Sequence, residues 1–282
     1  MSSKTTLLDK QRKWALGIPC DVDSRGYVSS VSENLYQPLS TRAVDGFSNG
    51  SGSELLDTPL RPAKMKALHS SAALAVNFFD YWTERSPDLL LTALGLGIAP
   101  TSIEFEAQFP TGLEGNPPNL DIAFRFRSGL VVGVESKFSE WLTPKSPNKE
   151  SFKPKYFDGP VGLWATKELP ACQRLAEALH SGRIQFRYLD APQLLKHALG
   201  LATQHPGYFE LYYLFFDCPG FESEVHRSEV VRFAELVGTD FRFRWSNYQD
   251  VFNRLTVSSA AARTSYMAYL GERYFLQKMI PL

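Results

Sequence analysis

Two short segments, residues 119–126 and 130–138, constrain the fold more than any other part of the chain. Each carries apolar residues in the pattern of a β-strand, and only residues 127–129 separate them. A connection that short is typical of an antiparallel hairpin. The chain is therefore predicted to contain a sheet built around this pair of strands.

The register of this hairpin depends on whether its loop has two or three residues. A two-residue loop, 128 and 129, would put Asp121 and Glu135 on opposite faces of the sheet. A three-residue loop ends in Gly129, which suits the left-handed conformation favoured at that position. It also creates one continuous apolar face from the pairs Ile122/Val134, Phe124/Val132 and Phe126/Leu130. We therefore predict the three-residue register.

On the other face, this register places Asp121 directly opposite Glu135, with Lys137 two residues further on. Paired residues have Cβ atoms about 5 Å apart, and facing like charges destabilise a sheet unless something binds between them. Two carboxylates at that separation can share Mg²⁺, which prefers oxygen ligands and takes few of them from protein. Ala123 and Gly133 lie beside the acids on this face, and their small side chains predict a depression that admits a substrate backbone.

A purely structural explanation stays open for the same residues. An exposed strand end with a cluster of structural charges would produce the same short pattern. Chemistry and structure therefore remain rival explanations for Glu135 and Lys137 on the motif and register alone.

The pattern of the remaining sequence predicts helices before, between and after further strands. The order is helix, three strands in a meander, helices, strand, helix, strand, helix, which indicates a mixed sheet flanked by helices in an α/β protein. The predicted helices cover 65–85, 86–96, 167–182, 191–205, 228–238 and 258–275, and the further strands cover 102–109, 208–218 and 240–245.

Residues 1–65 lack this periodicity and are rich in Ser, Gly, Asp and Pro, so we predict an irregular N-terminal extension before a domain at 66–282. The 30 basic and 30 acidic residues cancel, so a nucleic-acid partner would need a local basic patch. The three cysteines are far apart and odd in number, and no signal peptide or membrane span is evident. We therefore expect a cytoplasmic protein without membrane association.

The segments "HSSAALAVNFFDYW", "NLDIAFRF" and "VESKFSEW" resemble the PD-(D/E)xK nuclease superfamily, and in particular an uncharacterised bacterial subfamily. The resemblance rests on Asp121, thirteen intervening residues and then Glu135-Ser136-Lys137 on a hairpin that follows a helix and a first strand. It covers roughly residues 68–220. The proline of the motif is missing, because Leu120 precedes Asp121.

This resemblance implies a restriction-endonuclease-like core and assigns roles to several residues. Asp121, Glu135 and the backbone carbonyl of Ser136 would bind Mg²⁺, with Mn²⁺ as an alternative ion. Lys137 would be the catalytic lysine. The superfamily often adds a polar residue from a later helix, and Gln193 is the candidate for that catalytic role.

A basic loop after the hairpin is the candidate surface for nucleic acid. It interleaves lysines with Trp141, Phe152, Tyr156 and Phe157, and aromatic side chains can stack on bases. An ordinary solvated loop is an equal alternative. The candidate phosphate contacts are Lys145, Lys149, Lys153 and Lys155, with Arg125 extending the patch from the strand.

The expected function is hydrolysis of phosphodiester bonds in DNA by a metal-activated water. RNA as the substrate and a homodimer as the assembly are left open. The alternative is a catalytically silent module that keeps the nuclease fold and binds nucleic acid or another protein.

Overall fold

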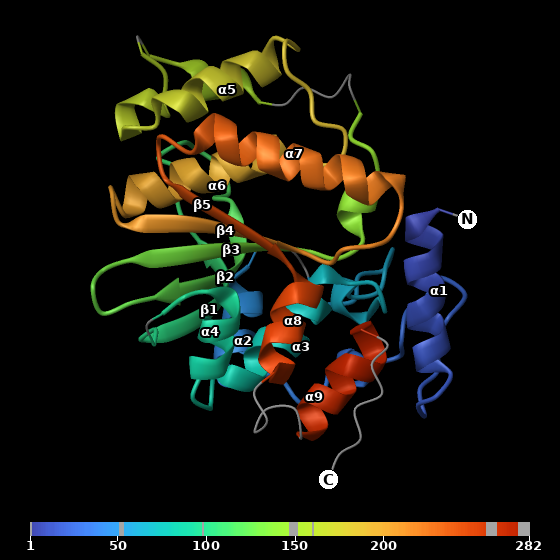
Figure 1. Ribbon diagram of the computed structural model, residues 1–282. Coiled ribbons are helices and arrows are strands. Elements are labelled where there is room, and N and C mark those ends of the chain that lie inside the picture. Colours follow the sequence, from blue (N-terminus) through green and yellow to red (C-terminus); the bar gives the residue numbers. More distant parts are fainter. Residues whose placement is uncertain are drawn as a thin grey trace.

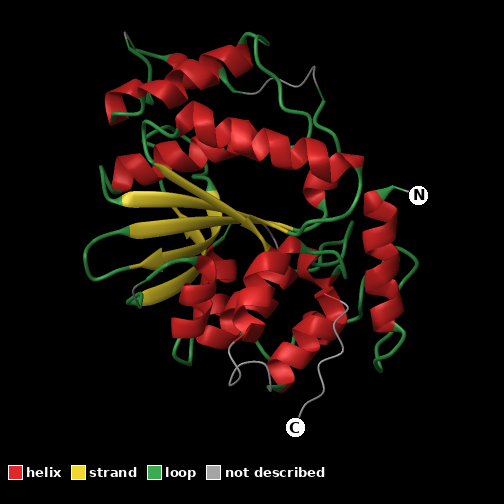
Figure 2. Cartoon of the chain, viewed as in Figure 1, coloured by secondary structure: helices red, strands yellow, loops and turns green. Residues whose placement is uncertain are grey.

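The computed structural model describes residues 2–50, 54–97, 99–146, 152–159, 161–257 and 264–275. At its centre is a sheet covered by helices (Figure 2). The sheet has five strands, which follow one another in chain order. The first two pairings, β1 with β2 and β2 with β3, are antiparallel, and the last two, β3 with β4 and β4 with β5, are parallel. The predicted mixed sheet is confirmed. The strands are β1 Ser102–Gln108, β2 Asn119–Arg125, β3 Val131–Lys137, β4 Phe209–Phe215 and β5 Arg242–Asn247.

Burial along the strands explains this order. Every residue of β4 is buried, and β3 is buried except at Lys137, because helices cover both faces of these inner strands. In β1, at one edge, buried residues alternate with partly exposed ones. The strands with continuous apolar sequence therefore lie in the middle of the sheet.

Helices form one layer on each side of the sheet (Figure 1). Helices α5, α6 and α7 cover one face, and α3, α4, α8 and α9 lie on the other. The α-helices are α1 Ser3–Ala15, α2 Thr41–Asn49, α3 Ser71–Phe79, α4 Asp88–Leu94, α5 Pro170–His180, α6 Ala191–Gln204, α7 Phe221–Val237, α8 Tyr248–Val257 and α9 Ser265–Leu270. Short 3₁₀ turns cover Val31–Asn34, Lys64–Lys66, Asp80–Trp82, Glu140–Leu142, Pro154–Phe157 and Ala165–Lys167, and a π turn covers Gly271–Phe275. No described helix is both long and apolar enough to cross a membrane.

Some predicted helices differ in extent from the observed ones. The first predicted helix, 65–85, begins only at Ser71, because the Ser70 side chain accepts from the N–H of Ala73 and caps the helix there. Helix α7 starts seven residues earlier than predicted, at Phe221. The predicted C-terminal helix is helical in α9, and residues 258–263 lie outside the described part of the chain.

The N-terminal region that the sequence predicts as irregular contains two helices, so the prediction is wrong for α1 and α2. Helix α2 packs closely on β1: a Cβ built on Gly46 would lie 2.4 Å from the carbonyl oxygen of Phe105. The ring of Phe47 stacks on that of Phe105 with centroids 5.9 Å apart. Polar residues dominate both helices, and the glycine that allows the close approach to β1 also weakens the helical pattern. The domain boundary at 65/66 stays a prediction.

A buried arginine joins the first and last described parts of the chain. Arg273 is 1% exposed, and its guanidinium donates to the backbone carbonyl of Asn34 over 2.7 Å. The guanidinium also lies 4.3 Å from the ring centroid of Trp14, and the Gln11 side chain donates to the Arg273 carbonyl over 3.1 Å. The C-terminal segment therefore supplies several of the contacts that hold helix α1.

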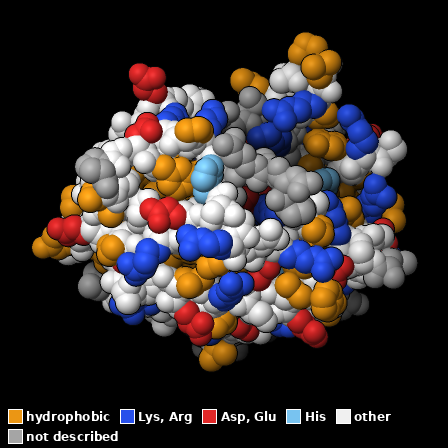
Figure 3. All heavy atoms as spheres, turned by 90° about the horizontal axis from the view of Figure 1, so that it is seen from above, with side chains coloured by type: hydrophobic (Ala, Val, Ile, Leu, Met, Phe, Trp, Pro, Cys, Tyr) orange, Lys and Arg blue, Asp and Glu red, His pale blue; other side chains and the backbone are white. Residues whose placement is uncertain are grey.

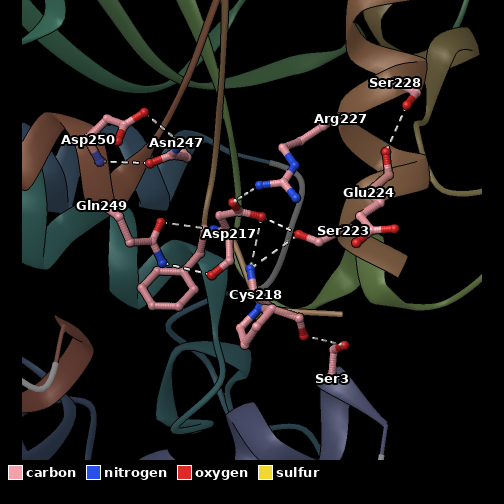
Figure 4. Close-up of polar contacts among 12 residues, drawn as sticks. Ser3, Asp217, Cys218, Ser223, Glu224, Arg227, Ser228, Asn247, Gln249 and Asp250 are labelled. Atoms are coloured by element: carbon pink, nitrogen blue, oxygen red, sulfur yellow. Dashed lines mark hydrogen bonds and ion pairs between the residues drawn. The ribbon is translucent and has the colours of Figure 1, made fainter. Parts of the chain in front are cut away.

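Beyond the end of β4, side chains take over from the backbone ladder (Figure 4). The amide of Gln249 pairs with the main chain of Asp217: it accepts from the N–H over 3.0 Å and donates to the carbonyl over 2.8 Å. The Asp217 carboxylate accepts from Ser223 and from Arg227, both on α7. These contacts fix the turn from β4 into α7, and their satisfied polar groups indicate a structural role.

Candidate active site

The hairpin of β2 and β3 has the three-residue register that the sequence predicts. Ile122 pairs with Val134. The N–H of Phe126 donates to the carbonyl of Leu130 over 3.0 Å, which closes a loop of residues 127–129. Gly129 has φ +87°, the left-handed conformation expected at the end of such a loop.

One residue beyond the last pair, Asp121 lies opposite Glu135. At this point the Asp121 side chain accepts a hydrogen bond from the N–H of Ser136 over 2.7 Å. The Ser136 hydroxyl lies 2.7 Å from that of Tyr248 on α8, so its side chain points to the other face of the sheet, as predicted. Burial, reinforced by the charge of Glu135, raises the pKa of Asp121 well above its usual range.

Glu135 is almost fully buried and is flanked by two basic side chains. Its Oε1 lies 2.5 Å from Nζ of Lys137, and its Oε2 lies 3.0 Å from Nε2 of His197. Burial alone would raise the pKa of Glu135, but the Lys137 ammonium and the His197 imidazole lower it to about 2. Burial alone would likewise lower the pKa of Lys137, but Glu135 and Asp121 raise it well above its usual range.

The contact between Glu135 and His197 leaves polar atoms without hydrogen bonds. The two atoms are near enough for an ion pair, yet they are not aligned for a hydrogen bond. Oε2 of Glu135 and both ring nitrogens of His197 are buried and have no hydrogen-bond partner among the described residues. A buried polar atom without a partner costs about 1–3 kcal/mol, so such a group indicates a missing ion, water or ligand.

The donor set fits a divalent cation that takes few ligands from protein. Asp121 and Glu135 supply carboxylate oxygens from adjacent strands, and one of those oxygens, Oε2 of Glu135, is unpartnered. Within the described part of the chain, no three His, Cys, Asp or Glu side chains are arranged to hold a metal together. An ion here would therefore complete its shell with water, backbone carbonyl or substrate oxygen, which is how Mg²⁺ usually binds.

His197 is the site residue that the sequence analysis misses. It lies one helical turn after Gln193 on α6, so both residues are on the same side of the helix. The side chain that reaches Glu135 is His197. The Gln193 side chain makes no hydrogen bond or ion pair with any described residue, and its backbone N–H donates to Asp190 over 3.1 Å. The spacing of four from Gln193 is the only sequence signal that points to His197.

The predicted depression beside the acids is wrong. A Cβ built on Gly133 would lie 2.4 Å from Cδ1 of Leu120 and 3.2 Å from Cδ1 of Leu201 on α6. Ala123 is completely buried. The two small residues make room for the packing of α6 on the sheet, and substrate has no access there.

Two of the lysines predicted to contact phosphate make contacts within the protein. The ammonium of Lys145 lies 2.8 Å from Asp190, the residue that caps α6. Lys155 donates to the Glu114 carbonyl. Lys153 is exposed, and Lys149 lies outside the described residues.

Arg125 does not extend this patch as predicted. Its Nε lies 2.6 Å from Glu104 on β1, and its guanidinium lies beside His205 at the far end of α6 from the site. The glutamate offsets its charge, so no free cation projects from this part of β2.

Two of the four aromatic residues of the basic loop are buried and offer no stacking surface. Trp141 and Phe152 are each 1% exposed. The Trp141 ring stacks on His226 with centroids 4.2 Å apart, and Phe152 packs edge-on against Trp164. The prediction that these two rings meet bases is wrong, because both belong to the core.

A cavity of about 970 Å³ adjoins the site. His197 belongs to its wall and also contacts Glu135, and the wall includes Asp190 and Lys145 as well. Burial alone would raise the pKa of Asp190, but Lys145 and, more weakly, Lys137 lower it, so this wall is within electrostatic reach of the catalytic lysine candidate. Figure 3, which views the molecule from the α5 side, shows Lys and Arg side chains gathered around a hollow in that face.

The chain matches the model of a known protein family. The family model described as "Restriction Endonuclease associating with ARP" matches residues 12–275, which is nearly the whole chain. No curated protein and no solved structure matches the chain. The match begins within α1, so it includes most of the region predicted as an extension.

Proposed function

The chain belongs to the family of restriction endonucleases associating with ARP, within the restriction-endonuclease-like PD-(D/E)xK superfamily, and from that premise we propose that it is a metal-dependent nuclease that hydrolyses phosphodiester bonds in DNA. The observation that carries the proposal is the carboxylate of Glu135, buried between Lys137 and His197 and facing Asp121. An acid pair with one unpartnered oxygen is suited to a divalent cation.

In this proposal, Asp121, Glu135 and the Ser136 carbonyl hold Mg²⁺, with Mn²⁺ as an alternative. A divalent ion lowers the pKa of a bound water and stabilises charge on a phosphoryl oxygen. Lys137 presents its ammonium at Oε1 of Glu135, where it stabilises negative charge and orients the attacking water. His197 positions the Glu135 carboxylate from the opposite side. The catalytic role that the resemblance assigns to Gln193 stays part of this proposal; Gln193 lies one helical turn before His197 and lines the adjoining cavity.

Plasmid nicking tests the proposal. The wild type is expected to nick supercoiled DNA in Mg²⁺, and chelation should abolish nicking. Glu135→Gln and Lys137→Met should each reduce the rate by at least about 100-fold, the scale of losing one charge-stabilising group. Lys167→Met, at an exposed lysine outside the predicted basic patch, is the matched control and should cleave normally.

A silent binding module is the second candidate, and one observation favours it. Lys137 already forms an ion pair with Oε1 of Glu135, so the carboxylate has a positively charged neighbour without a metal. DNA binding that weakens with salt, without cleavage in any divalent ion, would establish this function in place of the first.

The family description also names an association with ARP. We extend that partner to this chain as part of the proposed function.

A further inference from the structure

The cavity beside Glu135 has the size of a ligand pocket. About 970 Å³ lies within the range of sites that enclose one small molecule or one nucleotide. Its wall runs from the start of β2, at Asn119, to the first turn of α6 and the segment between α5 and α6. A base pair inside a stacked duplex cannot enter a recess of this kind, because its faces are covered by its neighbours.

The wall combines the three chemistries that a nucleotide needs. Ile184 and Phe186 provide an apolar surface for the face of a base. The carboxamides of Gln185 and Gln193 each offer a donor and an acceptor, the pattern that matches the edge of a base. Arg187 adds positive charge for a phosphate on the same wall.

The wall is held in place before any ligand arrives. The Glu229 carboxylate on α7 accepts from the N–H groups of Tyr188 over 2.8 Å and of Leu189 over 2.9 Å. Asp190 caps α6 through the N–H of Gln193 and binds Lys145 from the loop after β3. Three separate elements therefore fix the segment between α5 and α6, which lowers the cost of ordering a ligand in the cavity.

We propose that this cavity holds one unpaired nucleotide of the DNA strand whose phosphate lies at Asp121 and Glu135. This proposal rests on the proposed nuclease function. His197 connects the two sites, since it forms part of the cavity wall and touches Glu135. The substrate is then single-stranded DNA, or a duplex from which one nucleotide is extruded at the cleavage point.

Binding without cleavage tests the cavity separately from the chemistry. The probes are a 12-nucleotide single strand carrying 2-aminopurine and the same strand in a closed hairpin duplex, each titrated in Ca²⁺. The single strand should bind at least about tenfold more tightly than the hairpin, the smaller end of what one stacked base contributes. Its fluorescence should change as the base leaves its neighbours.

Ile184→Trp fills the cavity and should remove this preference. Leu16→Trp, at a residue 87% exposed at the end of α1, is the matched control and should keep it. Gln185→Ala changes an exposed carboxamide of the wall and should alter which base is preferred without loss of folding. Thermal melting of each variant separates misfolding from lost binding.

The outcomes distinguish the two proposals. If no probe is ever cleaved in Mg²⁺ but Ile184→Trp abolishes the single-strand preference, the cavity is assigned correctly and the nuclease function is wrong. If the wild type cleaves plasmid DNA but binds hairpin and single strand equally, or if folded Ile184→Trp and Gln185→Ala both bind like the wild type, the cavity does not hold a nucleotide.

Discussion

Nε2 of His197 lies 3.0 Å from Oε2 of Glu135, and each of these side chains is no more than 2% exposed. The pair joins α6 to the central strand β3. It also explains why Glu135 keeps one orientation although Lys137 occupies only one of its two oxygens. His197 is therefore part of the proposed active site even though no motif includes it.

Replacing His197 should weaken metal binding more than it weakens the fold. Loss of a residue that orients a ligand carboxylate typically costs 10–100-fold in metal affinity or activity. We expect His197→Ala to reduce the affinity for Mn²⁺, measured by electron paramagnetic resonance or calorimetry, by about that factor. His197→Gln keeps a polar group near Oε2 and should restore part of the loss. Equal Mn²⁺ affinity in the wild type and both variants would show that His197 only fills space.

His226 should make the protein less stable in mild acid. Its Nε2 lies 2.9 Å from the Tyr213 hydroxyl, and burial, with smaller effects of Lys145 and Arg227, lowers its pKa to about 3. Between pH 3 and about 6.5 the unfolded chain binds a proton that the folded chain refuses. Stability from this residue is therefore present above pH 6.5 and is lost as the pH falls, by up to about 1.4 kcal/mol per pH unit.

Urea unfolding between pH 4.5 and 6.5 measures this dependence. His226→Gln should have a lower stability at pH 7 but a flatter pH profile than the wild type. His180→Gln, at an exposed histidine, should keep the wild-type slope. The same slope in all three proteins would mean that His226 is protonated in the folded state.

Gly133→Ala should destabilise the sheet under α6. The new methyl group would lie 2.4 Å from Cδ1 of Leu120, in a core where added carbon typically costs about 1–3 kcal/mol. Gly97→Ala is the control, because a Cβ there meets no atom within 4 Å. Denaturant unfolding should show a loss for the first variant alone; a neutral Gly133→Ala would mean that the space beside the acids is open after all.

Glu229 should stabilise the cavity wall through backbone hydrogen bonds. It accepts from the N–H groups of Tyr188 and Leu189, and hydrogen bonds to a charged group contribute about 1.5–3 kcal/mol. We expect Glu229→Ala to lower the free energy of unfolding by an amount in that range. Glu235→Ala, exposed on the same helix, should change it by less than about 0.5 kcal/mol.

The hairpin was predictable because its pattern has only one good solution. A shift of one residue would set apolar side chains against polar ones, so the pairing of Ile122 with Val134 follows from sequence. The position of Asp121 opposite Glu135 follows from that pairing. The parallel addition of β4 and β5 was predictable only as a mixed sheet, because sequence pattern does not give strand order.

The parts of the site that depend on helix docking could not be predicted in the same way. Periodicity places Gln193 and His197 on one side of α6, but only the packing of Leu201 on Gly133 decides which of them reaches Glu135. The rings of Trp141 and Phe152 lie in a segment with lysines and prolines, and their burial depends on partners, His226 and Trp164, that are far away in sequence. Local composition therefore predicted the wrong environment for both rings.

The contact between Gln11 and Arg273 spans 262 residues of sequence. During synthesis at about 5–20 residues per second, α1 would emerge from the ribosome some 13–50 seconds before the arginine that anchors it. For that interval the helix relies on contacts with the parts of the chain already made, such as the packing of Ala15 with Val28 and Leu68. The joint at Arg273 thus makes completion of this fold a late event, set by the rate of translation as much as by the speed of folding.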